Sequence, residues 1–108
     1  MTAKETIRVV FLGTPLFSVP GLQTLLDASN IEVIGVLTQP DRPSGRGQKL
    51  TPPPVKILAL ENNLPVFQPK SLKKDEACIA WLKEQQPDFL ITIAFGQILS
   101  QDVLDIPK

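Results

Sequence analysis

The sequence predicts an α/β fold built on a parallel sheet with helices on both faces. Short apolar runs rich in β-branched residues alternate with segments whose apolar residues recur at helical spacing. The run Ile31–Thr38 is nearly all apolar in its second half, which is typical of a parallel strand covered on both faces. The chain has 108 residues, the size of one domain. Together these observations favour strand–helix–strand units with right-handed crossovers.

The first strand is expected over Ile7–Leu12, an apolar run that a turn-forming segment follows. A helix comes next, and it has two conceivable starts. A start at Thr14 would place Pro20 inside the helix, where its ring clashes with the carbonyl four residues back. Ser18 as the N-cap leaves Pro20 in the first turn, so we expect the helix to begin there and to end at Asn30.

The second half of the chain repeats the alternation. A short run over 65–69 is bounded by prolines, so we expect this strand near a sheet edge, whereas the run over 89–95 is the most apolar strand. Cys78 and Trp81 lie on one side of the helix between them and are predicted core residues. The other expected elements are a helix opened by Pro52-Pro53-Pro54 and ending near Asn62, a helix starting within Ser71–Asp75 and ending near Gln86, and a short helix capped by Ser100 and stopped by Pro107.

These strands predict a Rossmann-like sheet in the order 3-2-1-4, with only the first half of the fold, about four strands, present. Ligands of such sheets bind beyond the carboxyl ends of the strands, where the strand order reverses. In this chain that crevice lies between the ends of the first and fourth strands. Its predicted lips are Gly13 and Thr14 on one side and Phe95, Gly96, Gln97, Ile98 and Leu99 on the other.

A dinucleotide does not suit this crevice. Pro15 and Ser18 occupy the places of the second and third glycines of the fingerprint, and Thr38 and Gln39 stand where an acid should hold the ribose. Gly13-Thr14 either receives an anion on backbone N–H groups or is a simple tight turn.

The segment after the fourth strand leaves two interpretations open. It offers backbone donors and acceptors beside apolar side chains, which suits a planar heterocycle. Alternatively, Ile98 and Leu99 are only the packing face of a turn.

The connection Thr38–Leu50 is unusual. It has no periodic apolar positions, and with the prolines after it exceeds the roughly 12–15 residues beyond which structureless loops are uncommon. We expect no secondary structure in it. Its cations Arg42, Arg46 and Lys49 are separated by Gly and Pro, and phosphate is their natural partner. A disordered, solvating loop explains the composition equally well, and Asp41 beside Arg42 is either an exposed pair or a catalytic acid.

Composition excludes several classes of site. The formal net charge is zero, so any nucleic acid must meet a local patch. There is one cysteine and no histidine, which removes disulfides, zinc–cysteine clusters and the commonest general base. No run reaches the roughly 20 apolar residues of a membrane span. We expect a cytoplasmic, reduced protein without a metal.

Several motifs together resemble the N-terminal part of the methionyl-tRNA formyltransferase family. The resemblance covers nearly all of the chain from Ile7, and the basic connection together with the end of the fourth strand is its specific part. The motifs are Gly13-Thr14-Pro15 with Phe17, Thr38-Gln39-Pro40-Asp41-Arg42-Pro43, Gly45-Arg46-Gly47, Pro54-Val55-Lys56, Leu64-Pro65-Val66-Phe67-Gln68-Pro69 and Ala94-Phe95-Gly96-Gln97-Ile98-Leu99.

The resemblance implies formyl transfer from 10-formyltetrahydrofolate to the amino group of methionine on initiator tRNA. It assigns contact with the tRNA acceptor stem to Arg42, Arg46 and Lys49. It also implies that the pterin ring lies against the segment 95–99, with Gly13 and Thr14 lining the same cleft.

The family's catalytic asparagine, histidine and aspartate follow the point where this sequence stops, and its C-terminal β-barrel is also absent. The resemblance therefore implies that residues 1–108 are the N-terminal portion of the catalytic domain and are inactive alone. Two alternatives remain. One is a non-catalytic half-domain that associates with itself or a partner through the unpaired fourth strand. The other is a formyltransferase acting on an amino sugar, against which the basic connection counts.

Overall fold

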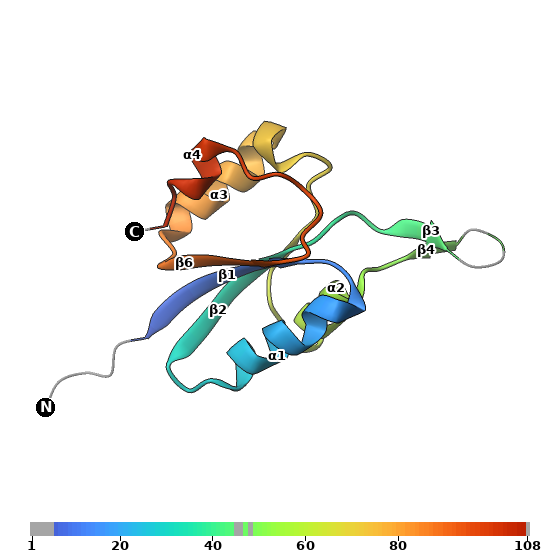
Figure 1. Cartoon of the computed structure of the whole chain (residues 1–108), viewed down its shortest axis with the longest axis horizontal. Helices are drawn as coiled ribbons and strands as arrows, with labels where there is room; N and C mark the ends of the chain where they lie inside the picture. Colours follow the sequence, from blue (N-terminus) through green and yellow to red (C-terminus); the bar gives the residue numbers. More distant parts are fainter. Residues whose placement is uncertain (1–5, 45–46, 48, 108) are drawn as a thin grey trace, which may run out of the picture.

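The computed structural model describes residues 6–44, 47 and 49–107. Its centre is a four-stranded parallel sheet (Figure 1). In sequence order its strands are β1 (Ile7–Gly13), β2 (Ile31–Leu37), β5 (Val66–Phe67) and β6 (Phe89–Ile93). They lie side by side as β5-β2-β1-β6. This order is the predicted 3-2-1-4, so the Rossmann-like α/β prediction is confirmed.

Helices cover both faces of the sheet (Figure 1). Helices α1 (Val19–Asp27) and α2 (Pro54–Glu61) lie on one face, and α3 (Glu76–Gln85) and α4 (Gln101–Leu104) lie on the other. Short 3-10 turns, η1 (Leu16–Ser18) and η2 (Leu72–Lys74), precede α1 and α3. Among the described residues, no helix is long and apolar enough to cross a membrane.

Alternation along β1 explains the two layers. Val10 and Leu12 belong to the cluster under α3 and α4, whereas Phe11 belongs to the cluster under α1 and α2. All three are fully buried, and burying each such side chain contributes about 1.5–3 kcal/mol. Cys78 and Trp81 lie in the first cluster, as predicted. The central part of a strand that must fill two cores has no room for polar side chains, which accounts for the apolar run over 9–12 that follows Arg8.

Two helix starts agree with the sequence prediction and one strand end differs from it. Ser18 is the N-cap residue of α1, as predicted, although its buried hydroxyl donates to the Ile93 carbonyl (2.5 Å) instead of capping the helix. The cap of helix α3 is Asp75, the last residue of the expected range, which accepts a hydrogen bond from the Cys78 N–H (2.9 Å). Strand β6 stops at Ile93, since Ala94 turns to φ 52° and leaves the sheet.

The prediction that Thr38–Leu50 lacks secondary structure is wrong. Its described residues form a two-stranded antiparallel ribbon, with β3 (Arg42–Ser44) pairing with β4 (Lys49–Thr51). The ribbon stands out from the rest of the molecule (Figure 1). Backbone pairing needs no apolar period, so cations and a proline on the strands concealed it.

Close packing at Gly35 generates a stability prediction. A Cβ at Gly35 would lie 2.4 Å from the outer edge of the Trp81 ring, whose centroid is 4.5 Å from that of Phe67. Gly35→Ala should lower the free energy of unfolding by about 1–3 kcal/mol through overpacking. Chemical denaturation measures this. Trp81→Phe removes the clashing edge, so Gly35→Ala should cost less in that background, and strictly additive effects would contradict the prediction.

Candidate functional site

The carboxyl ends of three strands are tied together by Thr14. Its hydroxyl donates to the Phe95 carbonyl (2.8 Å) and accepts from the Gln39 N–H (3.2 Å). These residues follow β1, β6 and β2 respectively. The crevice predicted at the reversal of strand order is therefore closed at its base by one side chain.

Gly96 is required by its surroundings. Its φ is +94°, which side chains rarely adopt, and a Cβ there would lie 2.6 Å from the Gln39 amide nitrogen. That amide donates to the Gly96 carbonyl (2.9 Å). The chain after β6 thus turns back across the end of β2 in close contact with it.

Gln97 joins this turn to the segment after β5. Its side-chain NH2 donates to the Pro69 carbonyl (2.8 Å) and to the Gln39 side-chain oxygen (2.9 Å). Its own side-chain oxygen accepts from the Leu72 N–H (2.7 Å). A single amide therefore holds three separate connections in register at this edge.

The predicted segment 95–99 divides into two groups. Gly96, Gln97 and Ile98 line a cavity of about 330 Å³ together with Lys70, Ser71 and Lys73. Phe95 and Leu99 instead pack into the core, with Phe95 only 4% exposed. Ile98 is 90% exposed, so its interpretation as a packing residue is wrong, whereas for Leu99 it holds.

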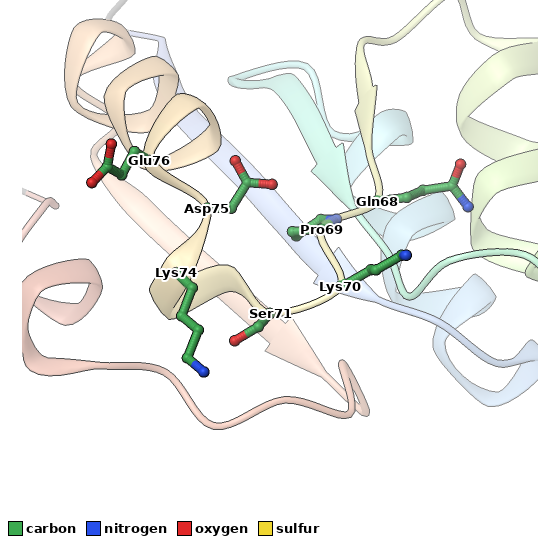
Figure 2. A pocket seen from close by; sticks show the side chains of 7 residues that line it. All are labelled: Gln68, Pro69, Lys70, Ser71, Lys74, Asp75 and Glu76. Carbon is green, nitrogen blue, oxygen red and sulfur yellow. The ribbon is translucent and has the colours of Figure 1, made fainter.

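A second, larger cavity adjoins the first and shares Lys70 and Ser71 with it. Its volume is about 600 Å³. Figure 2 shows Lys74 and Ser71 pointing to one side of it and the carboxylates of Asp75 and Glu76 on the other. Sequence reasoning missed this rim of mixed charge, which Lys70 and Lys74 form with Asp75 and Glu76. Its signal was the lysine-rich run directly after a strand, which the carboxyl-edge rule places beside the crevice.

The ribbon of β3 and β4 meets the crevice at its base. A mainly apolar cavity of about 200 Å³ is lined there by Thr14, Pro15, Pro40, Arg42, Thr51 and Pro52–Pro54. Arg42 and Lys49 are exposed on the ribbon, and Arg46 lies outside the described residues. Gly13 does not line this cavity and sits tightly instead, since a Cβ there would lie 2.9 Å from the Ile93 carbonyl oxygen.

Asp41 is neither an exposed partner of Arg42 nor a catalytic acid, the two roles expected from the sequence. Its carboxylate pairs with Lys56 Nζ (3.1 Å) rather than with Arg42, and it accepts from the Gln68 side-chain NH2 (2.6 Å). The hydrogen bonds from Gln68 and then Lys56 hold the pKa of Asp41 below its usual range. Asp41 is therefore ionised at neutral pH and does not donate a proton there.

Cys78 offers no nucleophile. It is buried, and desolvation raises the pKa of its thiol to about 12, with the Asp75 charge adding to the shift. Within the described ranges, no group of three or more Cys, Asp or Glu side chains converges as a metal site. The crevice therefore supplies hydrogen-bond donors, acceptors and lysines rather than a reactive group.

Comparison with known proteins identifies the family. Residues 7–108 match the family model described as formyl transferase. The chain belongs to the formyl transferase family. This match covers the whole sheet and every lip of the crevice described above.

The curated relatives share the name methionyl-tRNA formyltransferase. Over 102 residues the chain is 57% identical to the methionyl-tRNA formyltransferase of Clostridium acetobutylicum, 51% to that of Geobacter sulfurreducens and 49% to that of Trichodesmium erythraeum. Each comparison covers 94% of this chain but only 30–32% of the relative. The predicted resemblance is confirmed, and the chain spans about a third of the length of these formyltransferases.

In this formyl transferase chain, Gln97→Leu should loosen the crevice. The change keeps the side chain's size but leaves the Leu72 N–H and the Pro69 carbonyl without their partner, at a cost of about 1–3 kcal/mol in unfolding free energy. Hydrogen exchange at the Leu72 amide should accelerate. Gln101→Leu is the control, because it removes one exposed amide–carboxylate hydrogen bond (2.7 Å) elsewhere. Equal effects of both variants on the Leu72 amide would contradict the role of Gln97.

Proposed function

We propose that this chain serves the transfer of a formyl group from 10-formyltetrahydrofolate to the amino group of methionine on initiator tRNA. The observation that carries the proposal is the position of the ribbon. Its exposed Arg42 lines a cavity together with Thr14. The Thr14 hydroxyl donates to the carbonyl of Phe95, the residue directly before Gly96, Gln97 and Ile98, which line the cavity of about 330 Å³. One side of the molecule thus offers cations for a nucleic acid next to a cavity for a small co-substrate, and the relatives are named methionyl-tRNA formyltransferases.

In this proposal the folate binds at the crevice. Gly96, Gln97 and Ile98 receive its pterin ring, with backbone groups for the ring nitrogens and the exposed Ile98 side chain for its apolar face. Phe95 and Leu99 support them from the core. Thr14, with Gly13 behind it, lines the same cleft.

The ribbon contacts the acceptor stem of the tRNA. Arginine and lysine at Arg42, Arg46 and Lys49 suit phosphate, and a protruding two-stranded ribbon can lay exposed cations along the backbone of an RNA stem. A formyltransferase for an amino sugar has no use for such a ribbon, so tRNA is the favoured acceptor.

Chemistry requires groups beyond those in the crevice. The sequence contains no histidine, Asp41 is held in an ion pair and Cys78 is buried. We place residues 1–108 as the N-terminal portion of a catalytic domain, with the catalytic asparagine, histidine and aspartate and a tRNA-binding barrel in the remaining length of the family's proteins. We expect the protein in the cytoplasm.

A self-associating half-domain is the second candidate, because one observation favours it. Strand β6 forms an edge of the sheet, with no further strand beside it among the described residues, and its Phe89 is 55% exposed. Sedimentation velocity at several concentrations distinguishes the two proposals, since a monomer leaves no role for edge pairing.

Salt dependence tests the RNA contact. Three phosphate contacts to a duplex acceptor-stem RNA predict a slope of about −3 in log K against log salt, at roughly 0.9 for each phosphate. Arg42→Ala should reduce that slope by about one. Lys83→Ala removes a cation of α3 that pairs with Asp102 (3.4 Å) and serves as the matched control. Fluorescence anisotropy measures both, and an unchanged slope for Arg42→Ala would remove the ribbon from RNA binding.

A formylation assay tests where the chemistry lies. Residues 1–108 with methionyl initiator tRNA and 10-formyltetrahydrofolate should give no detectable N-formylmethionine, because in this proposal the catalytic asparagine, histidine and aspartate lie in the remaining length of the family's proteins. Formation of N-formylmethionine by the pure chain would overturn the proposal that the catalytic groups lie outside residues 1–108.

A further inference from the structure

The ribbon of β3 and β4 is attached to the body through a small polar cluster at its base. Asp41 comes directly before β3, Lys56 lies in the first turn of α2 just after β4, and Gln68 follows β5. We propose that these three residues, here called the clasp, are positioning residues that set the direction of the ribbon for RNA. This inference rests on the proposed function of the ribbon.

The clasp joins both ends of the ribbon to the sheet. Lys56 Nζ lies 3.1 and 3.3 Å from the two carboxylate oxygens of Asp41, so the residues flanking the ribbon are held together. The Gln68 side-chain NH2 donates to Asp41 (2.6 Å) and to the Gln39 carbonyl (3.1 Å). Gln39 lies two residues after the end of β2, so the clasp is also attached to the connection that leaves the sheet.

The orientation of the Gln68 amide is determined by its neighbours. A carboxylate and a carbonyl, both acceptors, face it, so its NH2 group and not its oxygen must point toward them. In Figure 2 this side chain points away from Asp75 and Glu76, the carboxylates of the neighbouring cavity. Gln68 is also one of the residues that line that cavity, but its amide NH2 donates to Asp41 and Gln39 at the base of the ribbon.

A small rotation at the base of the ribbon produces a larger displacement further along it. At about 3.3 Å per residue, the three steps from Asp41 to Ser44 extend roughly 10 Å. A rotation of about 10° at the base then displaces Ser44 by about 2 Å, whereas a site must be held to about 0.5 Å. The described ribbon strands pair with each other and not with the four-stranded sheet, so its direction depends on its base.

The clasp contributes little to the core. The Lys56 and Asp41 side chains are 21% and 29% exposed, and neither belongs to an apolar cluster. Its loss should therefore change the direction of the ribbon without unfolding the chain, and this separates positioning from stability.

Spin-label distances test the clasp. Labels at Leu50→Cys on the ribbon and Glu61→Cys at the end of α2 report the angle between them, while the buried Cys78 stays unlabelled. Gln68→Leu removes both hydrogen bonds without a change of charge and should broaden the distance distribution. Gln23→Leu is the matched control, because it removes an amide–carboxylate hydrogen bond of similar length (2.9 Å) within α1. A narrow distribution in Gln68→Leu would overturn the clasp.

A pair of substitutions at Lys56 tests the ion pair separately from the Gln68 hydrogen bonds. Lys56→Met removes the cation but keeps an unbranched side chain and should also broaden the distribution, whereas Lys56→Arg should restore it. Circular dichroism confirms that each variant is folded. Broadening by Lys56→Arg equal to that of Lys56→Met would contradict the role of the ion pair.

RNA titration connects direction to function. At low ionic strength, Gln68→Leu should bind the acceptor-stem RNA about tenfold more weakly, as if roughly one charge-assisted contact were lost, and Gln23→Leu should bind it normally. Unchanged RNA affinity together with a broadened distribution would overturn the positioning role. If the unaltered chain binds no RNA, the proposed function fails, and the distance measurement still decides whether the clasp orients the ribbon.

Discussion

The crevice depends on glutamine side chains whose amide NH2 group and amide oxygen both make hydrogen bonds. Gln97 donates to Pro69 and Gln39 and accepts from Leu72, so these hydrogen bonds fix both the position of its side chain and the orientation of its amide group. Gln39 in turn holds the Gly96 carbonyl, and its backbone carbonyl receives Gln68. Three connections at the carboxyl edge, those after β2, β5 and β6, are joined in this way, and carboxylates, which only accept, could not replace these residues. The site is built from connections, and the amides give it the rigidity that a strand would otherwise provide.

The sheet beneath the site obeys a stricter constraint. A parallel strand with helices on both faces must alternate between two cores, as Val10, Phe11 and Leu12 do. Such packing leaves little room, and at Gly35 the Trp81 ring takes the volume that a side chain would need. The precision of the crevice follows from this density, because the strand ends that carry Thr14 and Gln39 cannot shift independently.

The sequence predicted the structural elements that depend on short or periodic patterns of apolar residues. Apolar runs located all four strands of the sheet, and the order followed from the doubly wound pattern that alternating strands and helices favour. The ribbon was missed because its pairing rests on backbone groups while Arg42, Pro43 and Lys49 carry no period. The amide network was missed for a different reason, since Gln39 and Gln97 are 58 residues apart and a glutamine in a loop gives no sign of its partner. Ser18 was placed correctly, but its buried hydroxyl bonds β6 because tertiary contact outweighs capping.

The separateness of the ribbon has a consequence for evolution. Its strands form a sheet of their own, beside the four-stranded one, and among the described residues they add nothing to the larger sheet's ladder. Insertions, deletions and charge changes in it are therefore decoupled from folding and cost little at the core. Sequence changes in the ribbon can therefore alter the surface that it presents while the four-stranded sheet and the crevice keep their packing.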